Sequence, residues 1–352
     1  MLKKLLQLAA RSKAQMAVFA GAAALCCGLS GPAQALGFDQ ISQVYFFGDS
    51  LSDSGFNDLI FGASSPKAPT FVNSGGYTWA QYIARDVKGF TLPVYPSASA
   101  PNPQDLITNN TIFFGAGDPV VSGTLNGIDY AAAGSTTNST GNGIAAPSLV
   151  QQIAFFLGTH STPLDPNAVY FIWSGANDFL VLLSGPTPTQ LQLLQTANTA
   201  ATNIANQVAL LSANGAKRIV VITLPNLGLT PLIVGMNNPT LSANLKTVTF
   251  TFNSMLNQKL GKVISQYGTK VLYIDSYDLL NNVISLTESG KPFVVSGQSF
   301  QFTNATNALC ASALTCFSAT NGHIFADPVH PTDMAHRALS LYVEEQILGW
   351  NA

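Results

Sequence analysis

The chain has 352 residues, 47% of them apolar and 9% charged, so it can bury a substantial core without help from metals or many disulfides. Its formal charge at pH 7 is −2, and it becomes −6 if the first 35 residues, which carry four basic and no acidic side chains, are removed. This acidic balance argues against nucleic acid as a partner.

The first 35 residues have the order of features of a secretory signal peptide. Basic residues come first, an apolar run follows at 16–29, and Ala33-Gln34-Ala35 supplies small residues. The run has 14 residues, fewer than the roughly 20 that span a bilayer, which disfavours an uncleaved membrane anchor. We expect cleavage near Ala35 and a secreted or periplasmic protein whose residues 36–352 form a single domain.

Two cysteines in the apolar run, Cys26 and Cys27, raise a lipoprotein as another alternative. The residues before them, Ala23-Ala24-Leu25, lack the small-residue pattern expected upstream of a lipid-modified cysteine. We therefore do not expect a lipid anchor.

After the leader, short apolar runs without alternation predict strands that are buried on both faces, as in a parallel sheet. Stretches with helical periodicity lie between them, and strands alternating with helices indicate an α/β sandwich. The predicted strands are 44–47, 168–173, 219–224 and 271–274, and the predicted helices include 191–211, 245–264 and a terminal helix at 333–348.

Residues 57–128 are rich in Gly, Pro, Ser and Asn. They show little regular pattern apart from one helical stretch at 77–87. We predict a loop-rich insert in the domain here.

A serine stands where the first predicted strand ends, in Gly48-Asp49-Ser50-Leu51-Ser52-Asp53. Gly48 permits a tight turn, and an amide at the start of a following helix would point its N–H outward with the positive end of the helix dipole behind it. Ser50 could therefore both attack a substrate and stabilise an oxyanion. The alternative is a helix N-cap, because this pattern is also ordinary helix-start chemistry.

A candidate base for a nucleophilic serine, with a carboxylate to orient it, occurs near the other end of the chain, in Asp327-Pro328-Val329-His330-Pro331. Two prolines stiffen the turn, and an Asp three residues before a His can place its carboxylate against the imidazole Nδ1–H. Nε2 is then free to face a serine. The alternatives are a capping aspartate beside a surface histidine, or His323 as a rival base, although His323 lacks the Asp-x-x-His pattern.

Such a site also needs donors aimed at the developing negative charge. Gly134 can present a backbone N–H from a loop, and Asn177 follows the second predicted strand, so both lie near strand ends, where α/β sites form. A plain turn glycine and a helix cap are the alternatives for these two. Asp49, Asp53 and Asp178 lie in separate turns, and we interpret them as caps rather than metal ligands.

Cys310 and Cys316 remain after the leader and stand six positions apart in a stretch rich in Gly, Ser, Thr and Asn. In an oxidising compartment such a pair favours a disulfide over a metal site. The short loop would contribute only about 2 kcal/mol by chain entropy. Its expected use is therefore local, to hold the segment that leads into Asp327 and His330.

Taken in order, these segments resemble the GDSL lipase family, also called SGNH hydrolases, over residues 45–336. The resemblance rests on four ordered blocks, which are the residues from Gly48 to Asp53, the segment ending at Gly134, Gly175-Ala176-Asn177-Asp178, and the Asp327 segment. Residues 224–231 also resemble a Leu-Pro-x-Leu-Gly segment that many members carry. The resemblance implies a flavodoxin-like three-layer sandwich and acyl-enzyme chemistry that needs no metal or cofactor.

By this resemblance, Ser50 is the nucleophile, His330 the base and Asp327 the residue that orients His330. The oxyanion donors are the N–H groups of Ser50 and Gly134 and the side chain of Asn177. The second block departs from the family pattern, because many members begin it with Asn and have paired glycines, whereas this chain has Asp129-Tyr130-Ala131-Ala132-Ala133-Gly134.

The leader, the low charge content, the form of the first block and the predicted disulfide near the last block resemble secreted bacterial lipolytic enzymes. Those include lysophospholipases, phospholipases A and glycerophospholipid:cholesterol acyltransferases. We therefore expect lipid or other acyl ester substrates, transient contact with a membrane surface and no obligate protein partner. The alternatives are an esterase of short-chain or carbohydrate acyl esters and a non-catalytic binding module on the same fold.

Overall fold

The computed structural model describes residues 36–54, 71–73, 76–89, 128–138, 146–312, 316, 318–319 and 321–351. The predicted leader at 1–35 and most of the predicted insert at 57–128 lie outside these residues. Within the described segments, no helix is both long and apolar enough to cross a membrane.

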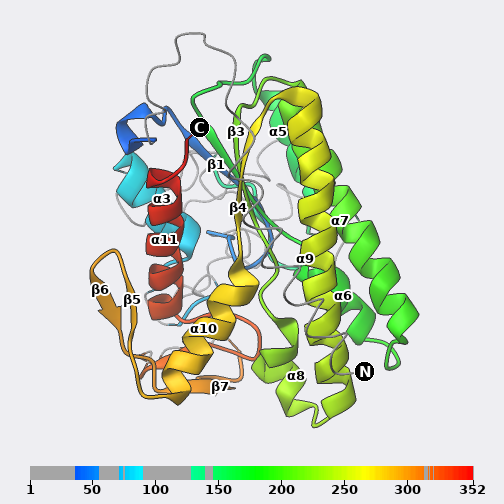
Figure 1. The fold of residues 1–352 in the computed structure, drawn as a ribbon, viewed down its shortest axis with the longest axis vertical. Coiled ribbons are helices and arrows are strands. Elements are labelled where there is room, and N and C mark those ends of the chain that lie inside the picture. Colours follow the sequence, from blue (N-terminus) through cyan, green and yellow to red (C-terminus); the bar gives the residue numbers. More distant parts are fainter. Residues whose placement is uncertain are drawn as a thin grey trace, which may run out of the picture. The chain divides into compact units, whose positions relative to one another are not determined.

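A four-stranded parallel sheet forms the centre of the fold (Figure 1). Its strands are all parallel and stand in the order β1 (Val44–Gly48), β2 (Val169–Trp173), β3 (Arg218–Ile222) and β4 (Lys270–Ile274). Each corresponds to a predicted apolar run. The runs are readable because a parallel strand is covered on both faces, and every residue of β2 is buried.

The segment 128–132 adds a fifth, strand-like element beside β1 that the sequence did not predict. The N–H of Phe46 donates to the carbonyl of Ile128, and the N–H of Tyr130 donates to the carbonyl of Phe46, both at 2.8 Å. In chain order the five elements therefore stand as 2-1-3-4-5, which is the flavodoxin-like order. In such a sheet, ligands bind in a crevice at the carboxyl ends of the strands, at the point where the strand order reverses. In this sheet the order reverses at β1.

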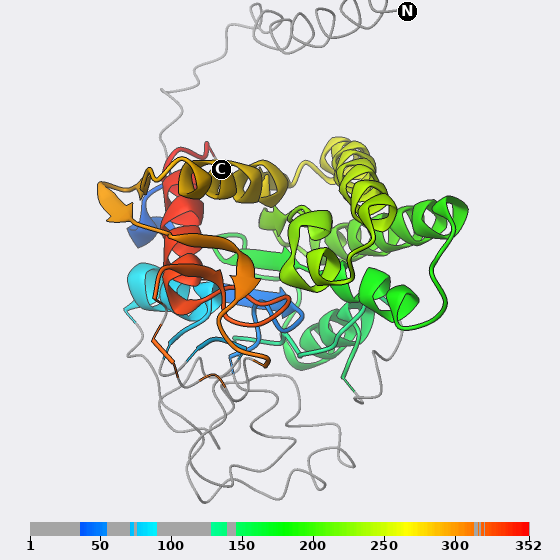
Figure 2. The ribbon, with the colours of Figure 1, turned by 90° about the horizontal axis from the view of Figure 1, so that it is seen from below.

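Helices cover both faces of the sheet, so the predicted three-layer α/β/α sandwich is confirmed (Figure 2). Neighbouring strand residues point to opposite layers, because Phe47 packs with the first helical layer and Phe46 with the second. The first layer holds α5 (Leu149–Thr159), α7 (Gln190–Ala213) and α9 (Pro239–Tyr267), and the second holds α3 (Trp79–Lys88) and α11 (Asp333–Leu348).

The helix starts follow capping side chains more closely than apolar periodicity. The predicted helix at 245–264 begins six residues earlier, since Pro239 occupies the first helical position and the side chain of Asn238 accepts the N–H of Leu241 at 3.0 Å. Thr189 caps α7 in the same way.

Short elements cover the carboxyl edge of the sheet, in the lower part of Figure 1. The sequence did not predict most of them, because each buries only a few residues. They are α6 (Ala176–Leu183) after β2, and η2 (Leu227–Leu229) and α8 (Pro231–Gly235) after β3. After β4 come α10 (Ser276–Glu288), β5 (Phe293–Val295), β6 (Gln298–Phe300), β7 (Asn304–Ala308) and β8 (His323–Phe325). A further short element, η1 (Phe38–Gln40), precedes β1.

Candidate active site

Ser50 lies in the turn that directly follows β1. Gly48 has a φ of 154°, and a Cβ atom there would lie 2.1 Å from the carbonyl oxygen of Trp173, so only glycine fits this close approach. The Asp49 carboxylate accepts the N–H of Leu51 at 3.1 Å, but this bond lies within a turn and caps no helix. The described residues 49–54 form turns rather than the helix start expected after Ser50.

His330 and Asp327 come from the turn between β8 and α11. Nε2 of His330 lies 2.8 Å from Oγ of Ser50, and Nδ1 lies 2.7 Å from Oδ2 of Asp327. The other oxygen of Asp327 accepts the backbone N–H groups of Val329 and His330, at 2.8 and 2.7 Å. The structure thus brings the three predicted residues into one hydrogen-bonded row.

The surroundings of Asp327 favour its ionised form. Burial would raise the pKa of Asp327, but the charge and the ring hydrogen bond of His330, together with two backbone N–H groups, lower it below its usual value. The carboxylate can therefore hold the proton-bearing Nδ1 of His330 and leave Nε2 to accept a proton from Ser50.

Asn177 and Gly134 border the same cavity as Ser50. Asn177 stands in the first turn of α6, and its Nδ2 donates to the carbonyl of Ser135 at 2.9 Å. An amide nitrogen has two hydrogens, so a second donor is available for an oxyanion. Gly134 has a φ of 81°, a backbone conformation that favours glycine. The predicted donors are therefore gathered beside the serine.

Asp53 and Asp178 hold the loop that contains Gly134. Oδ2 of Asp53 accepts the N–H of Ala133 at 2.8 Å, and Asp178 accepts the N–H and the hydroxyl of Thr137 at 3.0 and 2.7 Å. Both carboxylates thus tie separate segments together, a role that the capping interpretation did not include. Among the described residues, no group of His, Cys, Asp and Glu side chains could hold a metal ion.

His323, the rival base, lies on β8. Its Nε2 is 3.2 Å from Nδ2 of Asn304, whereas the imidazole that meets the hydroxyl of Ser50 is that of His330. The geometry thus favours His330 as the base.

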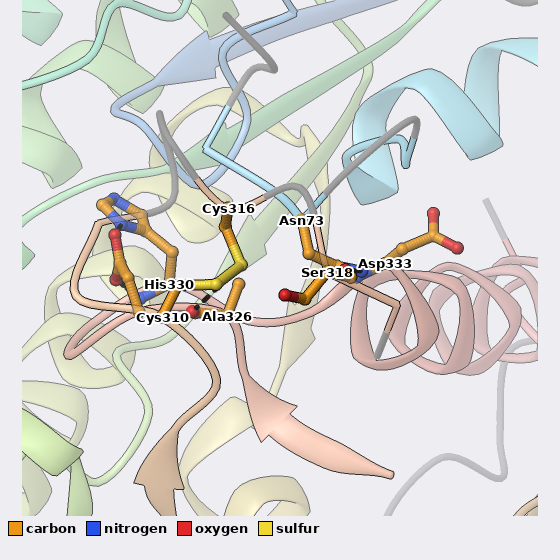
Figure 3. Close-up of a disulfide and its surroundings, with 8 residues drawn as sticks. Asn73, Cys310, Cys316, Ser318, Ala326, His330 and Asp333 are labelled. Atoms are coloured by element: carbon orange, nitrogen blue, oxygen red, sulfur yellow. Dashed lines mark hydrogen bonds and ion pairs between the residues drawn. A yellow bond between two sulfur atoms is a disulfide. The ribbon is translucent and has the colours of Figure 1, made fainter. Parts of the chain in front are cut away.

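The predicted disulfide between Cys310 and Cys316 is present and lies close to His330 (Figure 3). The N–H of Cys310 donates to the carbonyl of Ala326 at 2.9 Å, and the N–H of Ala326 donates to the carbonyl of His330 at 2.8 Å. The disulfide segment thus holds the chain next to Asp327, which agrees with the local role expected from its short loop.

Two residues beside the site were not found from the sequence. The ring of Phe71 lies 4.6 Å from the imidazole of His330, centroid to centroid. Asn73 accepts the N–H of Asp333 at 2.8 Å and donates to the carbonyl of Ser318 at 3.2 Å (Figure 3). Both belong to the predicted insert, where no motif or periodicity marks single residues.

Ser50 borders a cavity of about 280 Å³ with a largely apolar wall. The wall comes from the elements that cover the carboxyl edge of the sheet and from α11. It includes Leu180, Leu183, Ile233, Val283, Phe293 and Phe302. Such a cavity favours a hydrocarbon chain over a polar group.

A family model described as GDSL-like lipase/acylhydrolase matches residues 44–343. The GDSL esterase/lipase At5g45950 of Arabidopsis thaliana is 25% identical over 335 residues, which cover 85% of this chain and 86% of its own. Lipase 1 of Photorhabdus luminescens is 24% identical, and esterase EstA of Pseudomonas aeruginosa is 29% identical. Each of these two alignments covers 86% of this chain but only 49% and 46% of the relative, so the chain spans about half the length of these bacterial proteins.

Proposed function

We propose that this chain, which belongs to the GDSL-like lipase/acylhydrolase family and is a carboxylic ester hydrolase, acts on long-chain acyl esters of lipids. The observation that carries the proposal is the apolar cavity beside Ser50. Each methylene moved from water into apolar surroundings contributes about 0.8 kcal/mol, so this wall favours a long acyl chain over an acetyl group. Lysophospholipids, diacyl phospholipids and acylglycerols all carry such chains.

In the proposed reaction, Oγ of Ser50 attacks the acyl carbonyl carbon while Nε2 of His330 takes the hydroxyl proton. The carbonyl oxygen becomes an oxyanion that is stabilised by the N–H groups of Ser50 and Gly134 and by the Asn177 amide. The alcohol leaves with the proton from His330, and the acyl group stays on Ser50. Water, or another hydroxyl compound such as a sterol, then attacks the acyl carbon while His330 takes its proton. The bond from the acyl carbon to Oγ of Ser50 breaks, the acid or new ester leaves, and His330 returns the proton to Ser50.

The head group and the acceptor are tested together. Purified protein and its Ser50→Ala variant are incubated with lysophosphatidylcholine or diacyl phospholipid, with and without cholesterol, and fatty acid and cholesteryl ester are quantified. We expect Ser50-dependent release of fatty acid, and cholesteryl ester would add acyl transfer to hydrolysis. If neither lipid is cleaved while short soluble esters are, the lipid proposal is wrong.

Chain-length preference gives a sharper prediction. We expect kcat/KM on p-nitrophenyl esters to rise about fourfold per added methylene until the cavity is full. Ala338 lies in the cavity wall on α11 and is 4% exposed. Ala338→Phe should shorten the preferred chain and leave the rate on the acetyl ester, the internal control, within about twofold, because the acetyl group does not fill the cavity. A wild-type optimum at acetate would favour the short-chain or carbohydrate esterase alternative.

We also propose that α8 touches the lipid surface during catalysis. Ile233 lines the cavity, and its neighbours Val234 and Met236 are 43% and 42% exposed. No charged residue occurs from Ile219 to Leu245, so α8 itself carries no charge that would have to enter the lipid. The N–H of Leu232 donates to the carbonyl of Pro328 at 2.9 Å, which joins α8 to the turn that carries Asp327 and His330.

Val234→Glu should weaken sedimentation with phosphatidylcholine vesicles about tenfold or more, because a charge would have to enter the lipid interface. Ile264→Glu is the control, since Ile264 is similarly exposed, at 38%. It lies near the C-terminal end of α9, whereas α8 comes just before the N-terminal end of that helix. Both variants should keep wild-type rates on a soluble short ester. Equal vesicle binding by the two variants would contradict the proposal.

We further propose that the leader directs export and is removed near Ala35, on the basis of its sequence features. N-terminal sequencing of the protein from periplasm or medium tests this cleavage. An exported chain that still begins at Met1 would contradict it.

A further inference from the structure

A buried amide, Gln152 on α5, joins the nucleophile turn to the loop that carries Gly134. Its Oε1 accepts the N–H of Gly48 at 2.9 Å, and its Nε2 donates to the carbonyl of Gly48 at 2.8 Å. The same Nε2 lies 3.1 Å from Oγ of Ser135 and 3.0 Å from the carbonyl of Pro147. Gln152 is 0% exposed, so water does not replace these partners.

Two partners of Gln152, Gly48 and Ser135, lie near the three proposed oxyanion donors along the chain or through a hydrogen bond. Gly48 is the last residue before the turn in which Ser50 presents its N–H. Ser135 directly follows Gly134, and its carbonyl accepts Nδ2 of Asn177 at 2.9 Å. One side chain therefore connects the backbone at the end of β1 with the loop beside Gly134 and, through Ser135, with the Asn177 amide.

We propose that Gln152 is a positioning residue that sets the relative placement of the oxyanion donors. The inference rests on the proposed function of Ser50. Oxyanion donors act only when they lie about 2.7–3.1 Å from the developing charge, so small displacements of the turn and the loop weaken transition-state binding. Gln152 does not line the cavity, so ground-state binding of the acyl chain should not depend on it.

The fold offers a matched control in Asn253 on α9. Its Oδ1 accepts the N–H of Leu224 at 3.0 Å, and its Nδ2 donates to the carbonyl of Leu224 at 2.9 Å. This is the same pair of bonds to one residue near the end of a parallel strand, since Gly48 is the last residue of β1 and Leu224 stands two residues after β3. Asn253 is 6% exposed. Neither of these bonds reaches the loop at Gly134. Replacing Asn253 therefore tests how much activity and stability are lost when a buried amide of this kind is removed away from the oxyanion donors.

The experiment compares Gln152→Met, which keeps the side-chain length and removes the polar atoms, with Asn253→Leu. Both should lower Tm. Gln152→Met should lower kcat about 10²-fold with KM within about threefold, whereas Asn253→Leu should leave kcat within about threefold. An alkyl trifluoromethyl ketone, whose carbonyl carbon bonds to Oγ of Ser50 and forms a tetrahedral oxyanion, should bind Gln152→Met more weakly by the same factor. Affinity for the fatty alcohol of the same chain length, which carries no negative charge, should stay unchanged.

Equal changes of kcat in the two variants, or a parallel loss of ketone and fatty alcohol binding, would show that Gln152 acts in folding alone and would overturn the inference. If Gln152→Met does not fold, Gln152→Glu gives the same comparison, since it keeps an acceptor for the Gly48 N–H and loses the donor to the carbonyls of Gly48 and Pro147 and to Ser135. If the wild-type protein neither hydrolyses esters nor reacts at Ser50 with a fluorophosphonate, the proposed function itself fails, and the inference falls with it.

Discussion

Replacing Ser50 by alanine is expected to lower kcat for ester hydrolysis by a factor on the order of 10⁶. The substitution removes the hydroxyl whose oxygen lies 2.8 Å from Nε2 of His330, and with it the acyl-enzyme. His330→Ala should cost a similar factor, and the double variant should cost no more than either single one, because the pair acts as a unit. Release of p-nitrophenol and labelling by a fluorophosphonate measure these effects.

Two neighbouring residues control for general damage to the site. Ser52 stands two positions after Ser50, is fully buried, and its Oγ accepts Nε1 of Trp79 at 3.2 Å. Ser52→Ala should lower Tm by the loss of this bond and retain fluorophosphonate labelling. His323→Ala should also retain activity, and a loss of activity in His323→Ala but not in His330→Ala would refute the assignment of the base.

The parts of the fold that could be predicted from the sequence are those whose pattern is local. β1 and β2 are unbroken apolar runs, and β3 and β4 are apolar after their first residues, Arg218 and Lys270, because their side chains pack against two helical layers. The strand-like segment 128–132 escaped prediction because it is short and contains the buried Asp129, whose polarity breaks the run. Its pairing with Phe46 arises from tertiary structure, which no local pattern records.

The candidate site divides in the same way. Asp327 and His330 are three residues apart and meet within one turn, so their spacing alone predicts the contact. Gln152 meets Gly48 across 104 positions, and its sequence surroundings are those of an ordinary helix. Phe71 contacts His330 from the insert, where the composition predicts a loop but does not show which residue faces the site. Side chains that support a site from a distance are therefore the ones that required the structure.

Asp327→Asn is expected to lower kcat by roughly 10⁴-fold with little change in KM. Oδ2 of Asp327 accepts a hydrogen bond from Nδ1–H of His330 at 2.7 Å, and this bond fixes the tautomer in which Nε2 can accept the proton of Ser50. An amide in the same place can donate to Nδ1 and stabilise the opposite tautomer, in which Nε2 already carries a proton. Steady-state kinetics on a long-chain p-nitrophenyl ester measure the effect.

Two further measurements separate this role from a loss of folding. In the His330→Ala background, Asp327→Asn should have no added effect on kcat, because Asp327 acts on the reaction through His330. The carboxylate also contributes to stability, since its pKa is lower in the fold than in the unfolded chain, where it is about 4. That contribution is present above the unfolded pKa and is lost as pH falls through the folded pKa, so the stability difference between wild type and Asp327→Asn should shrink as pH falls from about 7 to about 3. A difference that stays constant with pH would mean that the fold does not favour the ionised carboxylate, and that His330 is oriented by another group.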